Sequence, residues 1–303
     1  MTRILRRLFS SLLLLWAVYT LTFLLTRFAP GNPFSEGRHL PPDVMANLLA
    51  TYHLDRPLWE QYLLTLGQML SGDFGTSYKA TGIPVSEILS QTLPVSLTLG
   101  ILAFVVSIFL GLATGLLIGI GPPLLARLLR YGTTLLVGLP SFLLAAVLID
   151  VVALHAGLLP AALWEGWRSA ILPVLALAIA PAGYLARVFA ASMEETLDSP
   201  FYRTSLANGI LGRRRILFHL ILPSLNAVLA LLGPLAAAFL TGSFVVETVF
   251  AIPGMGRVFV LSVMNRDYPL IMGTTLVYTV FLTVAILVGD LLQEGADPRV
   301  RSL

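Results

Sequence analysis

The sequence predicts an all-α membrane protein, a polytopic chain with six transmembrane helices. Of its 303 residues 57% are hydrophobic and only 12% are charged, whereas soluble domains carry about 25% charged residues. The mean hydropathy is +0.87. A hydrocarbon core of about 30 Å needs roughly 20 apolar residues per helix. Stretches that meet this requirement lie near Leu8–Thr26, Val95–Ile120, Thr133–Leu154, Ala170–Phe189, Leu225–Val246 and Leu270–Val288.

The first apolar stretch is predicted to be a membrane span and not a signal peptide. Arginines precede its leucines, as they do in a signal peptide, but the apolar run is long and no small-x-small cleavage site follows it. The sequence Ala29-Pro-Gly-Asn-Pro33 comes next, which is typical of a turn that leaves the membrane.

Arginines cluster before the first span, in alternate loops and at the end of the chain. By the positive-inside rule, this pattern places both termini in the cytoplasm. No aromatic interleaving or soluble platform accompanies these arginines, so nucleic-acid binding is not expected. The clustered residues are Arg3, Arg6, Arg7, Arg127, Arg130, Arg203, Arg213, Arg214, Arg215, Arg299 and Arg301.

An external segment separates the first two spans. A helix is predicted to begin after Asp55-Arg-Pro57, because apolar residues from Leu58 to Leu70 recur on one face. This helix either lies on the outer membrane face or covers the pore mouth, or it merely packs on its neighbours. A compact turn over Ser71–Ser77 follows it.

The second span carries small residues on one face, at a spacing of four. Such residues let two helix backbones approach closely. We expect plain helix packing or a moving or subunit-facing surface of the pore, and the two interpretations are compatible. The residues are Ser107, Gly111, Gly115 and Gly119.

Acidic residues lie in or beside three of the apolar stretches. Ionisable groups there are functional candidates because lipid burial is costly. Asp150 and Glu247 lie near the outer ends of the third and fifth spans. For each we keep two interpretations, a place on a substrate path or a structural hydrogen bond or ion pair. Asp290 lies at the inner end of the sixth span, where a structural role is favoured.

The most informative segment is the arginine-rich stretch between the fourth and fifth spans. Ser199 can cap a short helix, Pro200 suits its first position, and Gly209 suits a left-handed stop. A second helix is predicted to return to the membrane through Ile216–Pro223. A short capped helix between two spans is suited to transmit force to a soluble partner.

This segment resembles the cytoplasmic "EAA" loop of ABC-importer permeases of the oligopeptide/dipeptide/nickel family. Its Arg203-Thr204, Ala207, Gly209 and His219 have the spacing of that family's motif. Further strings occur in the family's order. They are Ala29-Pro-Gly-x-Pro33, Leu54-Asp55-x-Pro57 with Gln61-Tyr62, Gly72-Asp73-x-Gly75-x-Ser77, the run from Glu247 through Pro253-Gly-x-Gly256, Asp267-Tyr-Pro269 and Asp297-Pro-Arg299.

The resemblance implies a type I ABC-importer permease-like fold in a bacterial or archaeal plasma membrane. It implies half of a translocation pore for peptides or similar small solutes, with no cofactor. The implied partners are a second homologous permease subunit, two ABC ATPase subunits and an extracytoplasmic substrate-binding protein. The ATPase-coupling residues that it implies are Tyr202, Arg203, Thr204, Ser205, Ala207, Gly209 and His219.

The chain is expected to have two parts. Residues 1–91 would hold the first transmembrane helix and the external segment. Residues 92–303 would form a five-helix permease core, with a cytoplasmic coupling loop at about residues 191–224.

The sequence lacks the residues that an enzymatic function of the classes considered would require. The sequence has no cysteine, no phosphate-binding P-loop and no Gly-x-Ser-x-Gly elbow, and its four histidines are scattered. ATP hydrolysis is therefore expected in partner subunits. Alternatives that remain are a permease for nickel or another small metal chelate, a membrane-embedded hydrolase, and a non-transporting membrane scaffold.

Overall fold

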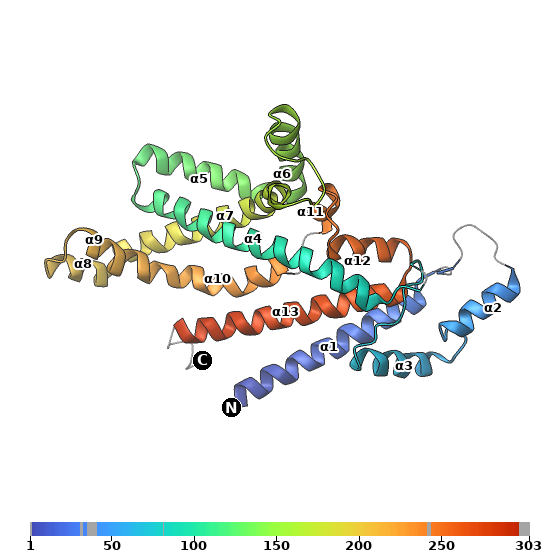
Figure 1. The fold of residues 1–303 in the computed structure, drawn as a ribbon. Helices are drawn as coiled ribbons and strands as arrows, with labels where there is room; N and C mark the ends of the chain where they lie inside the picture. Colours follow the sequence, from blue (N-terminus) through green and yellow to red (C-terminus); the bar gives the residue numbers. More distant parts are fainter. Residues whose placement is uncertain (1, 31–32, 35–40, 81, 241–243, 297–303) are drawn as a thin grey trace. The chain divides into compact units, whose positions relative to one another are not determined.

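The computed structural model describes residues 2–30, 33–34, 41–80, 82–240 and 244–296. Its regular elements there are helices, drawn in Figure 1. The chain divides into two compact units. Unit 1 comprises Met1–Ser96 and Pro253–Phe281, and unit 2 comprises Leu97–Ile252 and Leu282–Leu303.

In its described residues, unit 1 contains four complete helices and the first parts of two long ones. The complete helices are α1 (Thr2–Phe28), α2 (Pro42–Thr51), α3 (Leu58–Leu70) and α12 (Met255–Met264). The long ones are α4 (Val85–Ile120) and α13 (Tyr268–Ala296), which continue into unit 2. The expected helix after Pro57 is confirmed as α3.

One face of α3 packs against α1. The hydroxyl of Tyr19 donates to the carbonyl oxygen of Tyr62 at 2.7 Å, and the rings of Phe23 and Tyr62 meet edge to face, with centroids 5.3 Å apart. The side chains of Trp59, Leu63 and Leu70 remain exposed. Packing on a neighbour is therefore confirmed for one face, while other apolar side chains of α3 stay uncovered by the described chain.

The turn after α3 is tied to the start of α13. The hydroxyl of Ser77 donates to the carboxylate of buried Asp267, and the Tyr78 N–H donates to that carboxylate's other oxygen at 3.1 Å. The Gly-Asp-x-Gly-x-Ser and Asp-Tyr-Pro strings are thus the two halves of one buried contact.

Unit 2 is built around the long helix α7 (Trp167–Asp198). Figure 1 shows α5 and α10 beside it, and both contact it. The other elements are the last parts of α4 and α13, α5 (Pro123–Gly138), α6 (Ser141–Leu148), the π-helix η1 (Ile149–His155), α8 (Pro200–Ala207), α9 (Gly212–Arg215), the π-helix η2 (Ile216–Ile221), α10 (Leu222–Leu240) and α11 (Phe244–Val249).

The glycine stripe of α4 packs on α7. A Cβ atom placed on Gly111 would lie 2.7 Å from the Cβ of Leu185, and one placed on Gly115 would lie 2.8 Å from the Ala186 carbonyl oxygen. One placed on Gly119 would overlap Met193. The packing interpretation of this stripe is confirmed, because α7 of the same chain covers it.

Among the described residues, five helices are long and apolar enough to cross a membrane. These spans are Phe9–Phe28, Val85–Ile120, Trp167–Asp198, Gly212–Leu240 and Tyr268–Gly289. The fifth expected span, Leu225–Val246, corresponds to α10, which ends at Leu240. Residues 241–243 lie outside the described part.

The expected third span, Thr133–Leu154, is not one continuous helix. It is broken between α5 and α6, and the two arms, Pro123–Gly138 and Ser141–His155, are bent by 108°. Pro140 disfavours the helical conformation at Leu139, which is extended, with φ −86° and ψ 126°. The count of six spans therefore holds only when this bent pair is taken as one.

Candidate functional site

The candidate coupling site begins with a capped helix, as the sequence predicts. The Ser199 hydroxyl accepts from the Tyr202 N–H at 3.2 Å and donates to the Thr196 carbonyl oxygen at 2.6 Å. Pro200 occupies the first turn, where a missing N–H costs no intrahelical hydrogen bond. The start of α8 is therefore fixed relative to the end of α7.

The end of α8 is a Schellman turn. Gly209 has φ +72°, and its N–H donates to the Leu206 carbonyl oxygen at 3.0 Å. The N–H of Ile210 donates to the Ser205 carbonyl oxygen at 3.1 Å. These two bonds satisfy carbonyls that a helix end otherwise leaves open, and they need a left-handed residue between them. The predicted stop at Gly209 is confirmed.

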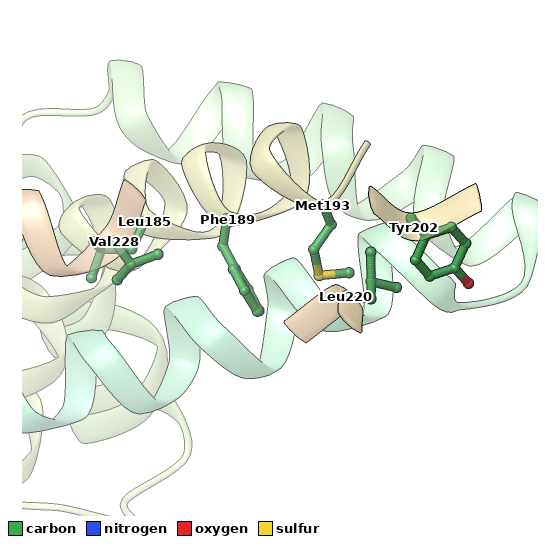
Figure 2. Close-up of a cluster of buried hydrophobic side chains, with 6 residues drawn as sticks. All are labelled: Leu185, Phe189, Met193, Tyr202, Leu220 and Val228. Atoms are coloured by element: carbon green, nitrogen blue, oxygen red, sulfur yellow. The ribbon is translucent and has the colours of Figure 1, made fainter. Parts of the chain in front are cut away.

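A hydrophobic cluster anchors α8 to the membrane helices. Figure 2 shows Tyr202 beside Leu220 of η2, with Met193 of α7 next along the same row. The Arg215 guanidinium lies 5.6 Å from the centre of the Tyr202 ring. The ring of Phe201 stacks on that of His219, with centroids 5.3 Å apart. Side chains of α7, before the loop, and of α9 and η2, after α8, thus hold α8 in place.

The predicted coupling residues divide into buried and accessible ones. Tyr202 and Ser205 are buried, and the Ser205 hydroxyl donates to the Tyr202 carbonyl oxygen at 2.7 Å. His219 is partly buried. The residues that remain exposed are Arg203, Thr204, Ala207 and Gly209.

Sequence analysis missed the apolar part of this exposed surface. Phe201 is 55% exposed and Leu206 is 43% exposed on α8. Leu211, in the turn after α8, is 72% exposed. The signal was present in the sequence, since large apolar residues stand among polar ones in a helix too short to bury them all.

The substrate-path candidates occupy different surroundings. Asp150 lies in η1 and is exposed, with its carboxylate 3.4 Å from Nδ1 of His155. Glu247 lies in α11 and is completely buried. The helix α11 packs against α6 and α7. Glu247 is therefore enclosed by the chain, which favours its structural interpretation, while the Asp150 side chain is accessible.

A charged recess between α5 and α7 was also missed. It has a volume of about 610 Å³, and Arg130 and Arg187 are among its lining residues. Arg130 forms an ion pair with Glu194. An arginine at position 187, inside the fourth expected apolar stretch, was the sequence signal for it.

A smaller cavity of about 310 Å³ lies in unit 1. Arg27 lines it, with its guanidinium 5.1 Å from the centre of the Phe23 ring and 5.4 Å from that of Tyr268. Tyr78 is also part of the lining. Burial raises the pKa of Tyr78 to about 12, although Arg27 acts in the opposite direction. Tyr78 is therefore a neutral hydrogen-bonding group at physiological pH.

Comparison with known proteins places these features in context. Residues 111–302 match the family described as "Binding-protein-dependent transport system inner membrane component". The oligopeptide transport system permease protein OppB of Haemophilus influenzae is 39% identical over 98% of both chains. The dipeptide transport system permease protein DppB of Bacillus subtilis is 40% identical over 94% of this chain and 92% of its own.

Solved structures show a similar fold. An inward-facing form of the MetNI methionine ABC transporter matches 69% of this chain and 96% of its own, with a TM-score of 0.58 and 16% identity. A crystal structure of an amino acid ABC transporter with histidines matches 69% of this chain and 94% of its own, with a TM-score of 0.57 and 18% identity. The helices described above therefore have the fold of type I ABC-importer permeases.

Proposed function

Because the chain belongs to the family of binding-protein-dependent transport system inner membrane components, we propose that it forms half of the translocation pore of an ATP-driven peptide importer. Its two similar relatives above are permeases of oligopeptide and dipeptide systems, which supports peptides as the solute class. The nickel or metal-chelate alternative has no such support. Neither do the hydrolase and scaffold alternatives, since these relatives are permeases.

The proposed partners follow from the family. They are a second homologous permease subunit, two ABC ATPase subunits that hydrolyse ATP, and an extracytoplasmic substrate-binding protein. The proposed setting is the bacterial or archaeal plasma membrane, with both termini in the cytoplasm. The arginine distribution supports this orientation.

Coupling to the ATPase is assigned to α8. The observation that carries this assignment is the contrast between the buried and the exposed side chains of the helix. Tyr202 is buried in the membrane-helix cluster, while Phe201, Arg203 and Leu206 are exposed. An apolar and basic surface held on a rigid, capped helix fits a groove on a soluble subunit. Movement of that groove would reach α7 and η2 through the buried side chains.

Cysteine cross-linking tests this assignment with a matched pair on one helix. Leu206→Cys presents an exposed thiol, and cross-linking to an ATPase subunit is expected. Ser205→Cys is the control, because Ser205 is 3% exposed and its side chain points into the chain. Cross-linking at Ser205 but not at Leu206 would contradict the proposed docking face. Absence of ATPase association with the wild-type chain would contradict coupling altogether.

A further inference from the structure

The recess between α5 and α7 carries a charged group that the proposed coupling role does not use. Its volume of about 610 Å³ lies within the range of small-ligand sites. The arginines enter from both helices, accompanied by hydroxyl groups. The lining residues are Ile118, Arg130, Thr134, Val137, Tyr184, Arg187, Val188, Ala190 and Ala191.

The α7 side of this recess is one exposed stripe. Tyr184, Arg187, Ala191, Glu194 and Asp198 are exposed and follow one another at intervals of three or four residues, which places them on one helix face. Much of the rest of α7 is buried among its neighbours. The stripe is therefore a polar surface on an otherwise enclosed membrane helix.

Arg187 follows the charge-free stretch Ser169–Ala186, which is about 27 Å long at 1.5 Å per residue. It therefore lies near the inner boundary of a hydrocarbon core about 30 Å thick. Charged side chains within membrane spans almost always face a protein interior or a water-filled cavity, since exposure to lipid is costly. The recess supplies such a cavity.

The charges in the recess are not balanced. Arg130 is paired with Glu194. Arg187 forms no hydrogen bond or ion pair with any residue that the structure describes. One guanidinium is therefore left over. Its planar set of N–H donors matches a carboxylate, which it can bind through two parallel hydrogen bonds.

We propose that this recess lies on the permeation route and that Arg187 binds the free carboxylate of the passing substrate. This inference rests on the proposed function, with a short peptide as the substrate. The hydroxyl of Tyr184, which lines the recess beside Arg187, is a further donor. Glu194 and Asp198 continue the stripe.

The test uses the complete importer in proteoliposomes, with its binding protein and ATPase subunits. Uptake of a dipeptide is compared with uptake of the same dipeptide amidated at its C-terminus, both below saturation. Arg187→Gln is expected to slow uptake of the free acid at least about tenfold, as for a lost charge-assisted hydrogen bond. Uptake of the amide should change little, and Arg187→Lys should restore part of the loss.

Arg127→Gln is the matched control. Arg127 is an exposed arginine of α5 that does not line the recess, so both uptake rates should stay at the wild-type value. Equal slowing of acid and amide by Arg187→Gln would overturn the inference. So would loss of the permease pair in that variant, which would assign Arg187 to a subunit interface.

Repeating the uptake measurement in vesicles of different lipid composition tells whether the anion bound in the recess is a peptide carboxylate or a lipid phosphate. If the effect of Arg187→Gln appears with phosphatidylglycerol and vanishes in vesicles of phosphatidylcholine alone, the recess holds a lipid phosphate and the inference is wrong. A wild-type importer that takes up neither dipeptide, although it couples ATP hydrolysis to another solute, contradicts the proposed peptide function instead.

Discussion

The ring of Phe201 stacks on the ring of His219, with the two planes inclined by 20°. Phe201 is at the start of α8, and His219 lies in the π-helix that leads back into the membrane. This contact joins the two ends of the proposed coupling loop. His219 thus packs against the start of α8, and a motif residue that looked isolated in the sequence has a packing partner.

The first prediction concerns the turn after α8. Gly209→Val should cost about 1–2 kcal/mol, because a β-branched residue is strained in the left-handed conformation. Nothing lies within 4 Å of the position that its Cβ would take, so the strain comes from the backbone alone. We expect normal membrane insertion but loss of ATP-driven uptake and of Leu206→Cys cross-linking.

Gly132→Val provides the control for that variant. A Cβ at Gly132 also meets nothing within 4 Å, but Gly132 lies inside α5 and has no positive φ. Its uptake should be close to the wild-type rate. Undiminished uptake by Gly209→Val, with normal ATPase association, would refute the assignment of this loop.

The second prediction separates anchoring from docking on α8. Tyr202→Ala removes a buried aromatic side chain and should destabilise the folded chain by about 3–5 kcal/mol. Phe201→Ala removes a largely exposed ring, so the change in stability should stay near the value of an aromatic pair, about 0.5–1.5 kcal/mol. Thermal unfolding in detergent and pull-down of the ATPase measure the two effects.

Phe201→Ala is expected to weaken ATPase binding more than it lowers the unfolding temperature. The reverse order, with Phe201→Ala the more destabilising variant, would show that the assignment of inner and outer sides is wrong.

The third prediction concerns topology. Ala46→Cys on α2 should react with an impermeant thiol reagent in intact cells, and Asn208→Cys beside α8 should not. Both positions are exposed, so neither reaction is limited by burial. Ser77 and Ser205 are unsuitable reporters because both are buried. Labelling of Asn208→Cys from outside would invert the proposed orientation.

The fourth prediction distinguishes the two acids. Asp150→Asn alters an exposed side chain, so the free energy of unfolding should change by no more than about 0.5 kcal/mol. Any loss of uptake in this variant would then report on the substrate path. Glu247→Gln alters a completely buried group and should lower stability by about 1–3 kcal/mol. A stable Glu247→Gln chain that fails in uptake would place Glu247 on the path.

The sequence by itself determined the class, most of the spans and the local form of the proposed coupling loop. Composition determined the class. The length of the apolar stretches determined the spans, because a bilayer imposes one length requirement on every spanning helix. The cap at Ser199 and the turn at Gly209 followed because they depend on neighbouring residues only.

The tertiary structure decided which residues far apart in the sequence contact one another and which side chains are buried. It joined Ser77 to Asp267, covered the α4 glycines with α7 and buried Ser205 while leaving Leu206 exposed. It also left Arg187 in a recess with no counter-charge among the residues that the structure describes. Local patterns fix where a helix begins and ends, but which face is covered depends on packing between segments far apart in the chain.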